Sequence, residues 1–266
     1  LHPSYIQRGQ WALYPFVRAD LMAAAQAALG FDPPKVQTAY DSITNPSFEQ
    51  VLEYIEECKK SPSTTIDIET AHRKIRAIGL SKSTTSAMSI PIRWKGMRNR
   101  WSYTELCLIL YKLRELYDSP TVKIAQNAGY DFLWLYPLIG FPREPIFDTM
   151  RAHALVYPEA PHDLGFIMST HTDMPYHKDE GRESTSDQEL WDYNNKDCIG
   201  EHIVYEKLVI ELKEIGMYEF FVGFTMPFFR LTVEMEREGV LVDKKAFDHR
   251  RKIVSRKAEW LERAIT

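Results

Sequence analysis

The chain has 266 residues, a formal net charge of −4 and 44% hydrophobic residues, which supports a folded domain with a substantial core. The charge argues against a protein that grips duplex DNA by phosphate contacts alone, because such proteins are usually basic. No apolar run approaches the roughly 18 residues of a membrane span, and no signal peptide is expected. The three cysteines are odd in number and lack metal-type spacing, which favours a reducing compartment.

The first segment, residues 1–46, is expected to be an N-terminal remnant and linker. The chain begins with Leu1 and stops inside a helical pattern, so we expect both ends to have been cut from something longer. An Ala-rich stretch predicts a helix over 15–29, ended by Gly30. Three prolines and several turn-forming residues predict an irregular linker over 31–46.

The second segment, residues 47–216, alternates between helical and strand patterns. Ser47 and Gln50 have the spacing of a capping box at the start of a helix. Apolar stripes predict helices over 47–60, 104–117, 130–139, 150–156, 163–169 and 188–215. β-Branched and apolar runs predict an antiparallel meander of strands 64–68, 75–80 and 87–92, then strands at 122–125 and just before Asp148. A polar surface loop is expected over 171–187. This order predicts an α/β ribonuclease H-like fold, with a mixed central sheet flanked by helices.

The third segment, residues 217–266, is expected to be a helical C-terminal extension. Its last part, 242–266, contains 8 Lys or Arg and 4 Asp or Glu, a local net charge of +4. An apolar helical stripe runs through the same part and has no visible partner. The basic helix fits a solvated face, or a helix that follows the backbone of a duplex.

Four carboxylates in three short contexts are the candidates for chemistry. Asp67 and Glu69 are two apart on a predicted strand and therefore share one face of the sheet. Adjacent carboxylates repel each other, and a cation relieves that repulsion. The pattern alone also fits a solvated surface pair. However, Ile66 and Ile68 predict a central strand, where an unpaired charge is costly.

The other two acids lie near a strand-to-helix junction and on the last long helix. Asp131 follows a strand and fits a helix N-cap, a metal ligand, or both. Asn127 either shapes the turn or reaches substrate phosphate or metal-bound water. Tyr193 and Asp197 are four residues apart and share one helix face, whereas Asp192 has the wrong phase. Together the four acids predict a pair of divalent cations that act on a phosphodiester, with the Tyr193 phenol orienting the attacking water.

These residues resemble the three exonuclease motifs of the DEDD superfamily, tyrosine subtype. The chain is similar over residues 60–215 to the 3′→5′ proofreading domain of family A DNA polymerases, in a phage-like form. The resemblance implies two divalent cations, Mg²⁺ or Mn²⁺, held by Asp67, Glu69, Asp131 and Asp197, with Tyr193 as a fifth catalytic residue. It implies a 3′→5′ exodeoxyribonuclease that releases nucleoside 5′-monophosphates from a single-stranded DNA 3′ end.

Three further residues, Asn127, Thr70 and Arg73, are expected to contact the substrate. The stretch 71–74, Ala-His-Arg-Lys, departs from the family because it is more basic than the usual run. How this stretch meets the 3′ end therefore stays open.

The flanking segments carry resemblances of their own. Residues 226–243 resemble the passage into the polymerase domain of family A polymerases, so 217–266 are expected to be its truncated start. The missing polymerase domain is then the expected partner, and this chain is expected not to polymerise DNA. Leu1-His2-Pro3-Ser4-Tyr5, with Arg8-Gly9, is similar to the last motif of uracil-DNA glycosylases, although the uracil pocket is absent.

Two rival functions remain open at this point. The domain could be a non-catalytic spacer that presents DNA to a polymerase, or the same motifs could serve an exoribonuclease. A zinc site is not expected, because the histidines at 72, 153, 162, 171 and 177 fit no common spacing. The expected location is the cytoplasm of a bacterium or a phage-infected cell, with no membrane partner.

Overall fold

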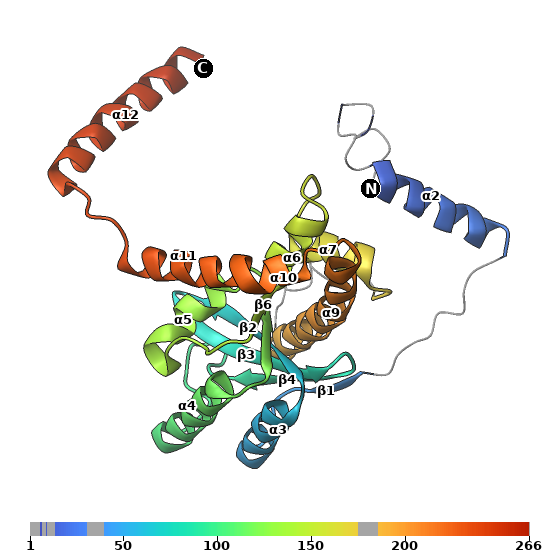
Figure 1. Ribbon diagram of the computed structural model, residues 1–266. Helices are drawn as coiled ribbons and strands as arrows, with labels where there is room; N and C mark the ends of the chain where they lie inside the picture. The colour runs from blue at the N-terminus through green and yellow to red at the C-terminus, as the bar shows by residue number, and fades with distance from the viewer. Residues whose placement is uncertain (1–5, 7–8, 10–13, 31–39, 175–185, 266) are drawn as a thin grey trace. The chain divides into compact units, whose positions relative to one another are not determined.

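The computed structural model describes residues 6, 9, 14–30, 40–174 and 186–265 (Figure 1). The chain divides into two compact units, Leu1–Phe229 and Arg230–Thr266. Two predictions lie outside the described residues: the glycosylase-like motif at 1–5 and most of the polar loop over 171–187. No described helix is both long enough and apolar enough to cross a membrane.

The described part of the first unit contains a six-stranded mixed sheet in the order β1-β4-β3-β2-β5-β6 (Figure 1). The strands are β1 Asp41–Ile43, β2 Ser63–Ala71, β3 Lys74–Ser83, β4 Ser86–Pro91, β5 Val122–Ala125 and β6 Ile146–Asp148. Strands β2, β3 and β4 form the predicted antiparallel meander. Strands β5 and β6 extend the sheet parallel to β2, which makes β2 a central strand.

Strand β1 corrects the prediction that residues 31–46 form only an irregular linker. It is three residues long and pairs in parallel with β4, Asp41 opposite Ser86 and Ile43 opposite Met88. Such a short edge strand has no local apolar signature, because its side chains are exposed or half-buried. Its pairing depends on a strand that lies more than forty residues further along the chain.

Helices pack on both faces of the sheet (Figure 1). Helices α3, α4 and α5 lie on one face, and α3 packs against α4. On the other face, α9 packs against β2, β3 and β4. Their bounds, with those of two shorter helices, are α3 Phe48–Lys60, α4 Tyr103–Asp118, α5 Gly129–Ile139, α6 Thr149–Val156, α7 Leu164–His171 and α9 Asp187–Glu214. The predicted capping box of Ser47 and Gln50 is confirmed, and Ser186 with Glu189 forms another at the start of α9.

A buried histidine fastens α9 to the sheet. The His202 ring lies between two serines, with Nε2 at 3.0 Å from Ser63 Oγ and Nδ1 at 2.8 Å from Ser81 Oγ. Burial lowers the pKa of His202 to about 4, so the imidazole is neutral at pH 7. A neutral ring satisfies both hydroxyls without placing a charge in the core.

The remaining helices flank this α/β layer in the sequence. They are α2 Tyr14–Ala28, α10 Tyr218–Phe220, the π-helix η2 Phe221–Thr225, α11 Met226–Glu238 and α12 Lys244–Ile265. The first compact unit continues past residue 216, with Phe221, Met226 and Phe229 buried. In the second unit, the apolar side chains of the predicted tail stripe are exposed, among them Phe247, Val254 and Trp260.

The contact between α9 and the sheet requires a glycine at position 79. A Cβ atom there would lie 2.5 Å from Cys198 Sγ and 2.6 Å from Asn194 Oδ1. We therefore expect Gly79→Ala to lower the free energy of unfolding by about 1–3 kcal/mol, as overpacking of a filled core does. Urea denaturation followed by circular dichroism measures this change.

The matched control is Gly96→Ala, because a Cβ at that loop position meets no atom within 4 Å. It is expected to change the free energy of unfolding by less than about 0.5 kcal/mol. Equal stability of the two variants would contradict the close α9–sheet contact.

Candidate active site

Strand β2 presents two acids on the face that α9 covers. Asp67 and Glu69 are half-buried, whereas their neighbours Ile66 and Ile68 are buried in the core on the opposite face. A β-bulge follows Glu69 directly, since Glu69 pairs with Ala77 and Thr70 pairs with Ile75. Bulges of this kind re-aim side chains at the end of regular pairing.

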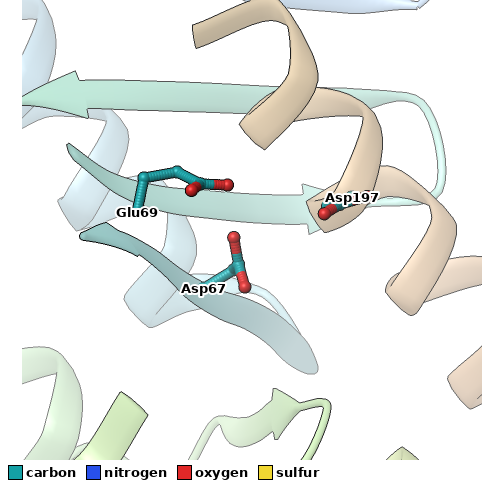
Figure 2. Close-up of side chains that lie close together, drawn as sticks. All are labelled: Asp67, Glu69 and Asp197. Atoms are coloured by element: carbon teal, nitrogen blue, oxygen red, sulfur yellow. The ribbon is translucent and has the colours of Figure 1, made fainter. Parts of the chain in front are cut away.

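Helix α9 brings a third acid to the same place. Carboxylate oxygens of Asp67, Glu69 and Asp197 all lie within 4.8 Å of one another. Figure 2 shows the two strand acids beside the helix that carries Asp197. Asp197 is buried, so its charge lies next to the two strand acids with little screening by water.

Asn194 fixes the orientation of Asp67. Its Nδ2 donates to Asp67 Oδ2 at 2.6 Å, and its Oδ1 accepts from Ser89 Oγ at 2.8 Å. The amide is fully buried. Asn194 is not among the residues that the sequence motifs predicted. The available signal was its position three residues before Asp197, on the same helix face.

Tyr193 lies beside the acids. Burial, followed by the charges of Asp197 and Glu69, raises the pKa of the Tyr193 phenol. A phenol that keeps its proton is a hydrogen-bond donor, and the Tyr193 hydroxyl is hydrogen-bonded to the Asp197 side chain. The hydroxyl is therefore able to hold a water molecule or a carboxylate in a fixed orientation.

Asp131 lies apart from the three-acid group. Its carboxylate is buried and accepts a hydrogen bond from the Ile68 backbone N–H at 3.0 Å. Burial, and then the Asp67 charge, raises its pKa well above the usual value for an aspartate. Asp131 is not the N-cap of α5, since that position belongs to Ala128. The residue instead ties the start of α5 to β2 between Asp67 and Glu69.

Asp148 holds the turn that leads to Asp131. Its fully buried carboxylate accepts from the backbone N–H groups of Asn127 at 3.2 Å and Ala128 at 3.1 Å. It also caps α6 through the N–H groups of Met150 and Arg151. Asn127 adopts a positive φ of 54° and is exposed. In the sequence, Asp148 marks only the end of a predicted strand, because four of its partners are backbone groups that no motif reveals.

The other two predicted substrate contacts lie at the end of β2. Thr70 Oγ1 is 2.8 Å from the Tyr130 hydroxyl, which joins β2 to the first turn of α5. Arg73 is exposed in the two-residue turn between β2 and β3, where His72 and Arg73 have φ of 49° and 59°. Both residues follow the acids directly in the chain.

Three of the histidines gather elsewhere in the first unit. His153 Nδ1 is 2.8 Å from His162 Nδ1, and the His153 and His171 ring centroids are 5.4 Å apart. In the part of the chain that the structure describes, Asp67, Glu69 and Asp197 form the one group of three or more side chains arranged to hold a metal ion.

The donor atoms of the three-acid group fit a hard divalent cation. All three ligands are carboxylates, and oxygen ligands are those that Mg²⁺ and Mn²⁺ prefer. The mutual repulsion of three negative charges favours a cation further. Cysteine and histidine, the ligands of softer metals, are absent from the group.

Comparison with known families agrees with this geometry. Residues 43–213 match the model of the 3′-5′ exonuclease domain of family A DNA polymerases. The chain therefore belongs to this family of DEDD-type 3′-5′ exonucleases. It is 27% identical over 218 residues to DNA polymerase I of Borreliella burgdorferi. That alignment covers 77% of this chain but 23% of the relative, so the chain spans about a quarter of the relative's length.

Solved structures with little sequence identity share the fold. Escherichia coli RNase D, an exoribonuclease involved in structured RNA processing, is 16% identical with a TM-score of 0.56, covering 76% of this chain and 51% of its own. The catalytic core of RRP6 from Trypanosoma brucei is 17% identical with a TM-score of 0.53, and the match covers 69% of this chain and 52% of the RRP6 chain. These likenesses establish the ribonuclease H-like fold, as the sequence predicted.

The three-acid group predicts a specific link between metal and stability. Without a divalent cation, Asp67→Asn/Glu69→Gln is expected to melt at a higher temperature than the unmodified chain, because two repelling charges are removed. With Mn²⁺ at about 100 times its Kd, the free energy of unfolding of the unmodified chain should rise by about 2.7 kcal/mol. That of the variant should change little. Differential scanning fluorimetry in EDTA and in Mn²⁺ measures both effects.

The control variant is Asp192→Asn, which removes one carboxylate from α9 outside the group. It should respond to Mn²⁺ like the unmodified chain. An equal Mn²⁺ response in all three proteins would show that the cation binds elsewhere.

Proposed function

We propose that the chain is a 3′→5′ exodeoxyribonuclease that hydrolyses the terminal phosphodiester of a DNA strand. The observation that carries the proposal is the group of three carboxylates within 4.8 Å, with Tyr193 four residues before Asp197. In the proposed reaction, the oxygen of a water molecule bonds to phosphorus and the bond to the 3′ oxygen breaks. The products are a nucleoside 5′-monophosphate and a strand shortened by one nucleotide with a 3′ hydroxyl.

The acids are proposed to hold two divalent cations, Mg²⁺ or Mn²⁺. Asp67, Glu69 and Asp197 would hold one, and Asp131, which bonds to the Ile68 N–H between the two strand acids, would contribute to the second. Such ions lower the pKa of water and offset the charge on the leaving oxygen. The raised pKa of Asp131 supports this assignment. Burial and the nearby Asp67 charge disfavour the ionised carboxylate, and a bound cation would offset both effects.

The protein's own groups have distinct roles in this proposal. The Tyr193 hydroxyl keeps its proton and orients the attacking water. Asn194 prevents Asp67 from turning away, through its bond of 2.6 Å. The Asp148 carboxylate fixes the turn at Asn127, so that Asn127 is presented to the substrate phosphate. Thr70 and Arg73, at the end of β2, are proposed to contact the terminal nucleotides.

We also propose that this nuclease is the proofreading part of a longer bacterial or phage DNA polymerase, acting in the cytoplasm. The similarity to a DNA polymerase I supports DNA as the substrate. In the proposed organisation, 1–46 are a remnant and linker, 47–216 the exonuclease domain and 217–266 the start of the polymerase domain. Because the compact unit extends to Phe229, the first helices after 216 would remain attached to the nuclease.

Degradation of a 5′-labelled single-stranded DNA in Mg²⁺ or Mn²⁺ tests the reaction. A ladder that shortens from the 3′ end, and that disappears with EDTA, is the expected result. The same assay on an RNA strand of matched sequence tests the sugar preference, and DNA should be degraded faster. Equal or faster loss of the RNA would contradict the assignment as a deoxyribonuclease.

Asp197→Asn is expected to reduce kcat by about 10³-fold or more, since metal ions contribute several kcal/mol of transition-state stabilisation. The matched control is Asp192→Asn on the same helix, whose carboxylate accepts from Gln188 Nε2 at 3.2 Å, outside the site. It should retain the activity of the unmodified chain. Equal rates for the two variants would exclude Asp197 from catalysis.

Tyr193→Phe is expected to lower kcat by about 10²-fold while KM changes little, because it removes only the hydroxyl that orients the water. Tyr205→Phe removes a phenolic hydroxyl from the same helix, where the ring packs against Phe147, and should leave kcat unaltered. Single-turnover degradation rates measure both variants. A Tyr193→Phe variant with full activity would rule out this role.

A further inference from the structure

A run of positive charge begins immediately after the strand acids. From Ala71 through Thr104 the sequence contains eight Lys or Arg residues and no Asp or Glu. The chain as a whole has a net charge of −4, so the rest of it carries −12. This stretch, like the basic C-terminal segment 242–266, is thus a local concentration of positive charge in a chain that is acidic as a whole.

The fold brings two parts of this run together. The backbone N–H groups of Ile92 and Arg93 donate to Arg76 O at 2.7 and 2.9 Å. The Arg93 guanidinium donates to Ile75 O at 2.7 Å. These bonds join the start of β3, directly after the β2–β3 turn, to the connection between β4 and α4. We call the resulting surface, residues 72–76 and 93–100, the basic lobe.

The basic lobe is attached to the part of α9 that carries Tyr193. Arg76 forms an ion pair with Asp187 at the start of α9. The rings of Trp94 and Trp191 are in contact, with centroids 5.6 Å apart. Since Trp191 is two residues before Tyr193, the lobe and the three-acid group lie at the same end of α9 and of β2.

Three exposed cations of the lobe lack acidic partners among the described residues. In the described structure, Arg73, Lys74 and Arg98 are exposed and no carboxylate forms an ion pair with them. Elsewhere on the first unit, Lys59 and Lys112 share the carboxylates of Glu56 and Glu115. The positive field of the lobe is therefore available to an external anion.

A cavity of about 280 Å³ adjoins these cations. Arg73, Lys74 and Arg93 line it together with apolar groups that include Ile75, Leu110 and Trp134. Trp134 is half-buried. The surface thus offers cations beside an apolar and aromatic wall, which match the phosphate and the base of a nucleotide.

We propose that the basic lobe and its cavity bind the substrate strand on the 5′ side of the cleaved nucleotide. The inference rests on the proposed function, in which the 3′ end reaches the three-acid group and the strand must leave over a neighbouring surface. A single-stranded nucleic acid is the occupant that fits, because its phosphates are negative and its bases stack on apolar surfaces.

Fluorescence anisotropy with 5′-labelled single-stranded DNA of 3 and 12 nucleotides tests the proposal. The full chain is used in EDTA, where no hydrolysis occurs, between 50 and 200 mM salt. The lobe variant is Lys74→Ala/Lys95→Ala/Arg98→Ala. The matched control, Lys60→Ala/Arg143→Ala/Lys207→Ala, removes the same charge from exposed positions outside the lobe. Lys60 and Arg143 precede β2 and β6, at the opposite end of the parallel strands from the acids.

The lobe variant is expected to bind the 12-nucleotide strand about tenfold more weakly than the unmodified chain. Its affinity for the 3-nucleotide strand should fall by a smaller factor. The slope of log Kd against log salt should fall by about 2, since each phosphate contact to a single strand contributes about 0.7. The control should bind like the unmodified chain. The charge-keeping variant Lys74→Arg/Lys95→Arg/Arg98→Lys should restore binding, which separates loss of charge from a change of fold.

Unaltered binding by the lobe variant would overturn the proposal, as would an equal loss in the control or a loss independent of strand length. Weakened binding of duplex DNA alone would also overturn it and would assign the lobe to the complementary strand. These outcomes do not depend on catalysis. A chain that degrades no DNA but shows the length-dependent loss would contradict the proposed function and leave the lobe assignment standing.

Discussion

Mutual repulsion among Asp67, Glu69 and Asp197 is the constraint on which the rest of this structure depends. Like charges within 4.8 Å oppose folding, so rigid packing has to hold the helix that carries one acid against the strand that carries the other two. Gly79 permits close approach, Asn194 bonds to Asp67, and the neutral His202 ring joins α9 to two strands. These contacts between α9 and the sheet offset the repulsion and hold the three acids in an arrangement that favours cation binding.

Strand β2 separates this charged site from the core. Its alternation places acids on the α9 face and isoleucines on the opposite face, so one nine-residue strand serves packing and chemistry together. Asp131 approaches from the start of α5 and bonds to the Ile68 N–H, between the two strand acids. The Asp148 carboxylate holds the preceding turn, so two buried aspartates, one behind the other, fix the position of α5 relative to β2.

Local patterns predicted those parts of the fold that depend on nearby residues. The capping box at Ser47 and the strand at 122–125 have signatures within a few residues, and the structure has both. Strand β1 escaped prediction because its pairing partner is remote and its side chains are exposed. Asn194 and Asp148 escaped for another reason: each is an ordinary polar residue in sequence, and its importance comes from partners that only the tertiary structure brings within hydrogen-bond distance.

The distribution of charge resolves an apparent conflict between composition and function. A chain with a net charge of −4 repels a polyanion at long range, and the acids of the site add to that repulsion. Cations bound by the acids would act on the phosphate that is cleaved, but their influence on more distant phosphates falls off within about 10 Å at 0.1 M salt. The basic lobe, joined to β3 through Arg93 and to α9 through Arg76, supplies attraction beyond that range. Attraction by the lobe and chemistry by the acids would then be separate properties, so each can be altered without loss of the other.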